Sequence, residues 1–256
     1  MIAFTNGRVC RAAACRIGLF TLGWMLWLPT LEAQRATRWI VGVDRSASRT
    51  AQQMADMRQF IQELGLHLSF GDHIALVQMF QANSDLVRQV RDSTLPLKYP
   101  PTATARETRQ LESLQRTVRQ RLSVSYTDTT GMKQVTSTDI LGFLRRASDY
   151  ARSGSRIPTT VVVLSDMLHS TPELDMERRG GVKNADWIEQ QRRLGLIPDL
   201  RGVCIAAIGG EIATPRGVAV QKFWTAYFTA AGAQFRAENY RRFMVPSDIT
   251  CSRVPS

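Results

Sequence analysis

Oxygen-bearing side chains follow apolar segments at separate places in the chain. The segment DRSAS places Asp44, Ser46 and Ser48 at alternate positions directly after an apolar run. Thr138 precedes a helical pattern, and Asp166 follows TVVVL, the most strand-like run in the sequence. Carboxylate and hydroxyl oxygens are the ligands that hard divalent cations such as Mg²⁺, Ca²⁺ or Mn²⁺ prefer. These residue types therefore predict a metal site, provided that the fold brings the segments together.

The elements that must position these side chains alternate between strands and helices. Strand-like runs occupy residues 39–43, 74–80, 160–164 and 203–208, with a short edge strand at 85–90 and a last strand within 233–244. Amphipathic patterns predict helices at 50–66, 140–151, 185–194 and 218–231. Strands joined through helices form a doubly wound, mostly parallel sheet with helices on both faces. Ligands bind at the carboxyl edge of such a sheet, which is where this single α/β domain would place Asp44 and Asp166.

This combination resembles the von Willebrand factor A domain over residues 37–245. The metal-ion-dependent adhesion site of that family consists of a strand ending in DxSxS, a threonine at the start of a later helix, and a strand ending in [ST]D. The resemblance implies that Ser46, Ser48 and Thr138 coordinate the ion directly or through water, and that Asp44 and Asp166 hold it largely through water. It implies Mg²⁺ as the ion, with Ca²⁺ or Mn²⁺ as alternatives, and a protein partner whose acidic side chain completes the shell.

The chain departs from the family pattern in three places. Met167 follows the last aspartate, where the family often has glycine, and the segment before Thr138 lacks the usual paired glycines. The stretch before that segment is longer than a compact A domain needs. We therefore predict a helical insertion at about 96–136, which contains a charged helix at 107–122.

Most of the candidate ligands also have a simpler interpretation as helix caps. Asp44 or Ser48 could accept hydrogen bonds from the helix that follows DRSAS, and Thr138 could cap the helix that begins near residue 140. Asp166 is harder to explain in this way, because an unpaired carboxylate at a buried strand end is costly. The sequence leaves the choice between metal ligand and cap open for Thr138.

The loop after the TVVVL strand carries further polar residues. His169 is three residues beyond Asp166 and could reach the site, but we predict that it faces solvent. Glu173, Asp175 and Glu177 predict a solvated segment that could also tune partner choice at the rim of the site.

The first 33 residues predict a signal peptide or an N-terminal membrane anchor. Arg8, Arg11 and Arg16 precede the uncharged apolar run at 17–31. Either alternative exports the domain, so that it is periplasmic or secreted, or tethered to the inner membrane by residues 17–31. Cys204 and Cys251 remain after these residues, and the sequence leaves open whether they form a disulfide or are buried thiols. Residues 246–256 are expected to form a C-terminal tail.

The composition is that of a folded protein with a positive surface. Hydrophobic residues make up 44% of the chain and charged residues 21%, which excludes wholesale disorder. The formal charge is +11, but the basic residues are scattered without a run of five or six, so no specific nucleic-acid partner is expected.

The sequence favours a binding module over an enzyme. An aspartyl-nucleophile phosphatase would need a second aspartate where Ser46 stands, and a serine hydrolase would need a GxSxG elbow that the chain lacks. The expected function is metal-dependent protein binding in adhesion or assembly. The alternatives are a metal-free structural module of the cell envelope or of a secretion or conjugation system, and a metal-dependent hydrolase.

Overall fold

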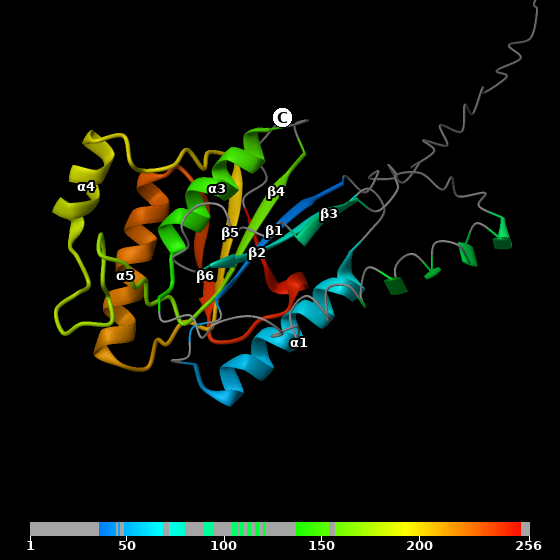
Figure 1. The fold of residues 1–256 in the computed structure, drawn as a ribbon, viewed down its shortest axis with the longest axis horizontal. Coiled ribbons are helices and arrows are strands. Elements are labelled where there is room, and N and C mark those ends of the chain that lie inside the picture. The colour runs from blue at the N-terminus through cyan, green and yellow to red at the C-terminus, as the bar shows by residue number, and fades with distance from the viewer. Residues whose placement is uncertain are drawn as a thin grey trace, which may run out of the picture. The chain divides into compact units, whose positions relative to one another are not determined.

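Six strands form one sheet in the order β3-β2-β1-β4-β5-β6 (Figure 1). The computed structural model describes residues 36–44, 46, 49–68, 72–79, 90–94, 104–106, 108, 109, 112, 113, 116, 117, 120, 137–153 and 157–251. The strands are β1 (Arg38–Asp44), β2 (His73–Met79), β3 (Val90–Thr94), β4 (Thr159–Leu164), β5 (Val203–Ile208) and β6 (Gln234–Arg241). Every neighbouring pair is parallel except β2 and β3, which pair antiparallel. The predicted α/β class with a mostly parallel sheet is confirmed.

Helices cover both faces of this sheet (Figure 1). They are α1 (Ala51–His67), α3 (Ile140–Arg152), α4 (Ala185–Arg193) and α5 (Pro215–Ala230), followed by the 3₁₀ turn η1 (Pro246–Asp248). The described residues between 105 and 120 are helical as well, within the predicted insertion. The helix predicted at 50–66 corresponds to α1, which contains Gly65 and ends at His67.

One predicted strand has different bounds in the structure, and the predicted N-terminal segment lies outside the described residues. The edge strand occupies Val90–Thr94, whereas the sequence placed it at 85–90, and residues 80–89 lie outside the described part of the chain. The predicted signal or anchor at 1–33 also lies outside it. Among the described residues, no helix is both long and apolar enough to cross a membrane.

The central strands separate two hydrophobic cores. Side chains alternate along β1, so that Val41 and Val43 pack in the core on the α1 side while Ile40 packs in the core beneath α3 and α5. Gly42 lets α3 come close to β1, because a Cβ atom there would lie only 2.7 Å from the ring of Phe143. This contact fixes the position of α3, which carries one part of the candidate site at its start.

The sheet order reverses between β1 and β4. The chain leaves β1 towards β2 on one side, and β4 lies against β1 on the other side, with Val43 opposite Leu164. The residues that follow, Asp44 and Ser165, therefore meet at the carboxyl edge of the sheet. A reversal of this kind opens a crevice for ligands in doubly wound folds.

A disulfide joins Cys204 in β5 to Cys251 near the end of the described chain, with the two Cα atoms 5.7 Å apart. The fully buried Asn239 of β6 fixes the same tail. Its side-chain nitrogen donates to the carbonyl of Thr250 at 2.9 Å, and its side-chain oxygen accepts from the Thr250 N–H at 3.1 Å. The disulfide and these hydrogen bonds thus hold the tail against the last two strands.

Removal of the disulfide should destabilise the domain. The bond closes a sequence separation of 47 residues, so that replacing Cys204 and Cys251 together by serine should lower the free energy of unfolding by about 4 kcal/mol. Urea denaturation with and without a thiol reductant measures the loss. The reductant should leave the midpoint of the doubly substituted protein unchanged. Equal midpoints for oxidised and reduced wild-type protein would contradict this role.

Candidate metal centre

Asp44 is the centre of a buried cluster of hydrogen bonds at the carboxyl edge of the sheet. Its side chain is fully buried. Its Oδ1 accepts from the N–H of Ser46 at 2.8 Å and from the hydroxyl of Thr138 at 3.0 Å. Its Oδ2 accepts from the hydroxyl of Ser165 at 2.8 Å. One carboxylate therefore connects the three segments that the sequence analysis identified.

The alternative interpretation of these residues as helix caps is wrong for Asp44 and Thr138. Thr50 caps α1, and its side chain accepts from the N–H of Gln53 at 3.2 Å. Asp139 caps α3 and accepts from the N–H of Gly142 at 2.7 Å. The hydroxyl of Thr138 is instead directed to Asp44. Ser48, the remaining predicted ligand, lies outside the described residues.

The end of β4 forms a tight turn that orients Ser165 and Asp166. The Ser165 oxygen accepts from the N–H of Met167 at 3.0 Å while its hydroxyl donates to Asp44. Oδ1 of Asp166 accepts from the N–H of Leu168 at 2.9 Å. These bonds hold Asp166 at the same edge as Asp44.

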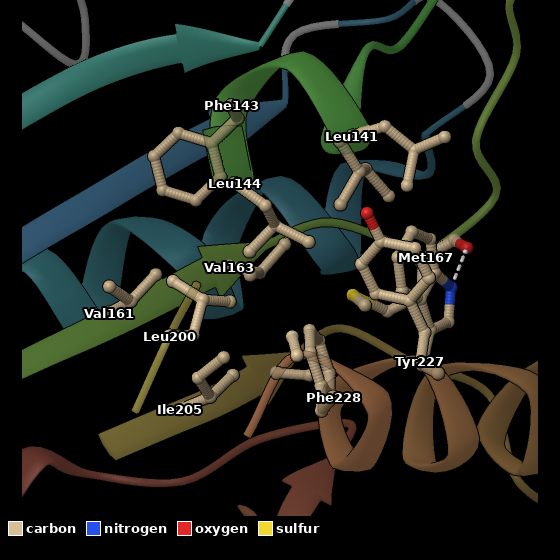
Figure 2. Packing of buried hydrophobic residues seen from close by; sticks show 14 of the residues in the cluster. Leu141, Phe143, Leu144, Val161, Val163, Met167, Leu200, Ile205, Tyr227 and Phe228 are labelled. Atoms are coloured by element: carbon tan, nitrogen blue, oxygen red, sulfur yellow. Dashed lines mark hydrogen bonds between the residues drawn. The ribbon is translucent and has the colours of Figure 1, made fainter. Parts of the chain in front are cut away.

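Met167 has the left-handed conformation that this turn requires, with φ at 68°. Such a conformation costs a residue with a Cβ atom roughly 1 to 2 kcal/mol. Here the Met167 side chain is fully buried in the core beneath α5, where Figure 2 shows it with Tyr227 and Phe228. The indole N–H of Trp224 also donates to the Met167 carbonyl at 2.8 Å. Side-chain burial and this hydrogen bond offset the backbone cost.

Burial, opposed by the hydrogen bond from Leu168 and reinforced by the negative charge of Asp44, raises the pKa of Asp166 to about 6. The ionised form of this carboxyl group is thus disfavoured by its surroundings. A cation placed between Asp166 and Asp44 would favour the ionised form. This electrostatic situation suits a site for positive charge.

Arg49 supplies positive charge to the cluster from the segment before α1. Its side chain is only 1% exposed, and its Nη2 lies 3.3 Å from Oδ1 of Asp44. Its Nη1 donates to the sulfur of Met57 at 2.7 Å. A buried guanidinium group therefore contacts the same oxygen that accepts from Ser46 and Thr138.

His169 is buried, contrary to the prediction that it faces solvent. Its Nδ1 accepts from the N–H of Ile140 at 3.0 Å, and its Nε2 lies 2.8 Å from the hydroxyl of Thr171. The imidazole thereby satisfies the first free N–H group of α3, two residues after Thr138. Burial lowers the pKa of His169 to about 4, so that the ring is neutral near pH 7. The His169 side chain points inward, where it provides the acceptor for the first N–H group of α3. The spacing of residues in the sequence did not indicate this role.

The acidic residues of the following loop make ion pairs at the surface. Glu173 pairs with Arg145 of α3 at 3.0 Å, and Asp175 pairs with Arg178 at 2.7 Å. Ser170 donates its N–H to the carbonyl of Thr138 at 2.9 Å. The loop is therefore attached to the start of α3 and lies beside the cluster around Asp44.

The donor set consists of two carboxylates and several hydroxyl groups. Asp44, Asp166, Ser46, Thr138 and Ser165 lie in the three connected segments, and all offer hard oxygen donors. Within the described residues, no three or more His, Cys, Asp or Glu side chains lie together in a group that could hold a metal ion. This chemistry suits Mg²⁺, Ca²⁺ or Mn²⁺ rather than a zinc site built from histidine and cysteine.

Sequence reasoning did not assign a role to two residues of the cluster. Ser165 carried a usable signal, because it directly precedes Asp166 at a strand end. Arg49 carried none, because an arginine after a serine-rich loop is ordinarily solvated. Only the three-dimensional arrangement reveals that its side chain is buried beside Asp44.

The His169 cap predicts a pH-dependent loss of stability. The pKa is about 4 in the folded protein and 6.5 in an ordinary histidine. As the pH falls from 6.5 to 4, the unfolded chain binds a proton that the folded protein does not, so the free energy of unfolding decreases, by up to roughly 3 kcal/mol. At pH 7.5 this contribution is fully present.

The control is His169→Asn, which retains an acceptor for the helix N–H but does not titrate in this range. Asp166, whose raised pKa acts in the opposite direction over a similar window, is present in both proteins and cancels in the difference. Urea denaturation between pH 7.5 and 4 should show a steeper loss for the wild type. Parallel pH profiles for the two proteins would refute the assignment.

Comparisons with solved structures find matches at low sequence identity. BatB from Bacteroides thetaiotaomicron is 11% identical, with 82% of this chain and 91% of that chain covered and a TM-score of 0.44. A variant of the PilB minor pilin from Streptococcus sanguinis is 12% identical, with 83% and 58% covered and a TM-score of 0.49. The manganese-loaded TRAP protein from Plasmodium vivax is 10% identical, with 80% and 67% covered and a TM-score of 0.42.

At these identities the likeness concerns the fold alone. No family model matches the chain, and no curated protein matches its sequence. The assignment therefore depends on the order and direction of the strands and on the DRSAS, threonine and serine-aspartate segments that meet at one edge. These features agree with the resemblance to the von Willebrand factor A domain that the sequence motifs indicate.

Proposed function

We propose that this chain is a protein-binding module that holds a divalent cation at Asp44, Ser46, Ser48, Thr138 and Asp166. Mg²⁺ is the ion we expect, with Ca²⁺ and Mn²⁺ as alternatives. The observation that carries the proposal is the convergence of three separate segments on the buried Asp44 carboxylate.

The surroundings of Asp166 support a cation in particular. Burial and the negative charge of Asp44 raise its pKa to about 6, so the surroundings of this carboxyl group disfavour its ionised form. A divalent ion would supply that charge, and the hydroxyl groups of Ser46 and Thr138 would supply further oxygen ligands. The metal would act as a Lewis acid towards an additional oxygen ligand.

An acidic side chain of a protein partner is the ligand we propose for that additional position. A carboxylate is the hard, anionic oxygen donor that such an ion prefers. The formal charge of +11 on the whole chain also favours acidic partners over basic ones. The module would therefore recognise a surface that presents an aspartate or glutamate.

Export is the proposed setting for this activity. The disulfide between Cys204 and Cys251 suits an oxidising compartment. The basic and apolar N-terminal segment is consistent with a signal peptide, or with an anchor that leaves the domain periplasmic.

Binding is favoured over hydrolysis by the state of His169. Both ring nitrogens are engaged, one by the N–H of Ile140 and the other by the hydroxyl of Thr171. The ring therefore has no nitrogen available to act as a general base towards Ser46 or Ser165. One observation favours the metal-free structural alternative, namely the ion pair between Arg49 and Asp44, which already provides a positive charge.

Thermal unfolding in EDTA and in excess Mg²⁺ tests the proposal. An ion at 100 times its Kd stabilises the native state by about 2.7 kcal/mol, which should raise the Tm of the full-length wild type by several degrees. Asp166→Asn and Thr138→Val, which each remove one oxygen ligand, should lose most of this rise.

Glu173→Gln is the matched control, since it removes an acidic side chain from the same loop that pairs with Arg145 instead. It should keep the full rise in Tm. If millimolar Mg²⁺, Ca²⁺ and Mn²⁺ all leave the wild-type Tm unchanged, the metal-dependent function is wrong and the metal-free module replaces it.

A further inference from the structure

Arg49 occupies an unusual position for a charged side chain. It is 1% exposed, and Asp44, the carboxylate beside it, is fully buried. A guanidinium group is ordinarily kept in water unless several acceptors replace its hydration, because removing it from water carries a large desolvation cost. Its placement therefore requires an electrostatic reason.

The contacts of Arg49 are few for a buried guanidinium group. Nη1 donates to the sulfur of Met57, which is a weak acceptor. Nη2 lies 3.3 Å from Oδ1 of Asp44 but is not aligned for a hydrogen bond, and Nε has no hydrogen-bond partner among the described residues. The interaction with Asp44 is thus mainly charge against charge rather than a bidentate pair.

Arg49 lies against the carboxylate that connects the segments of the candidate centre. Oδ1 of Asp44, which is 3.3 Å from Nη2 of Arg49, also accepts from the hydroxyl of Thr138 at 3.0 Å. A divalent cation at that centre would bind beside the same carboxylate and would be repelled by the guanidinium group.

We propose that Arg49 is an internal cation that competes with the divalent metal for Asp44 and so weakens metal binding at this site. The proposal rests on the proposed function, because it assumes that the centre can hold a metal ion. When no metal is bound, Arg49 neutralises the buried carboxylate and keeps the three segments together. When a metal binds, the guanidinium group must lose its contact with Oδ1 of Asp44.

This competition has a consequence for the domain. The folded structure does not depend on metal, because Arg49 supplies the necessary charge. The metal is held less tightly than the oxygen ligands alone would allow, so a partner carboxylate that adds a ligand has a larger influence on occupancy. Metal and acidic partner would then bind cooperatively, each increasing the affinity for the other.

Mn²⁺ binding to the full-length protein, measured by the loss of the free-ion signal in electron paramagnetic resonance, tests the proposal. Arg49→Met removes the charge while keeping a long side chain, and should lower the Kd for Mn²⁺ by about tenfold or more. Arg49→Lys keeps the charge and should bind close to the wild type. Arg145→Met is the matched control, since Arg145 pairs with Glu173 and is 39% exposed; its Kd should stay within about twofold of the wild type.

The outcomes separate this inference from the proposed function. Tighter binding in Arg49→Met alone supports the inference, even if wild-type binding is undetectable, in which case only the function of the wild type fails. Equal or weaker binding in Arg49→Met than in the wild type overturns the inference and leaves the function standing. Absence of Mn²⁺ binding in every variant overturns both.

Arg49→Met leaves Asp44 without its ion pair and could fail to fold in EDTA. In that case Mn²⁺ should restore the circular dichroism of the folded protein, because the ion replaces the missing charge. A variant that stays unfolded in excess Mn²⁺ would contradict the competition. If it folds in EDTA, the Arg49→Met and Asp44→Asn double variant should lose less stability than the sum of the two single variants.

Discussion

A carboxylate at the end of a central strand can be buried only if its hydrogen-bonding capacity and its charge are both satisfied. In this domain, Asp44 is such a group. Ser46, Thr138 and Ser165 donate to its two oxygens, and Arg49 places a positive charge beside one of them. Because these donors come from segments far apart in the chain, the solvation of one side chain determines how three loops meet. The candidate site is a direct result of that requirement.

The sheet provides the location for this cluster, and the loops provide its detail. β1 and β4 lie side by side at the point where the strand order reverses, so their carboxyl ends open towards the same crevice. Burial of Met167 holds the turn after β4 in a left-handed conformation, and His169 satisfies the start of α3. Both residues act by fixing the backbone that carries Asp166 and Thr138. Substitutions of Met167 or His169 should therefore change the positions of Asp166 and Thr138, although neither Met167 nor His169 is a proposed ligand.

The sequence predicted the parts of the structure that follow from local pattern. Apolar runs located the central strands, and the spacing within DRSAS together with the later threonine and serine-aspartate segments located the edge where they meet. It did not predict the burial of Arg49 or His169, because nothing local distinguishes a buried polar side chain from a solvated one in a loop. The pairing of Cys204 with Cys251 also needed the distance between strand and tail. The roles of Asp44 and Thr138 were separated from helix capping only when Thr50 and Asp139 proved to be the caps.

The central claim is that Asp44 and its partners hold a divalent ion, and crystallography with Mn²⁺ tests it most directly. Crystals of the protein grown with Mn²⁺ should show an anomalous scattering peak among Asp44, Ser46, Thr138 and Asp166, with the Arg49 guanidinium group moved away from Oδ1 of Asp44. A well-ordered edge with no anomalous peak and with Arg49 still against Asp44 would contradict the account. The buried carboxylate would then belong to a permanent ion pair that organises the loops of a metal-free domain.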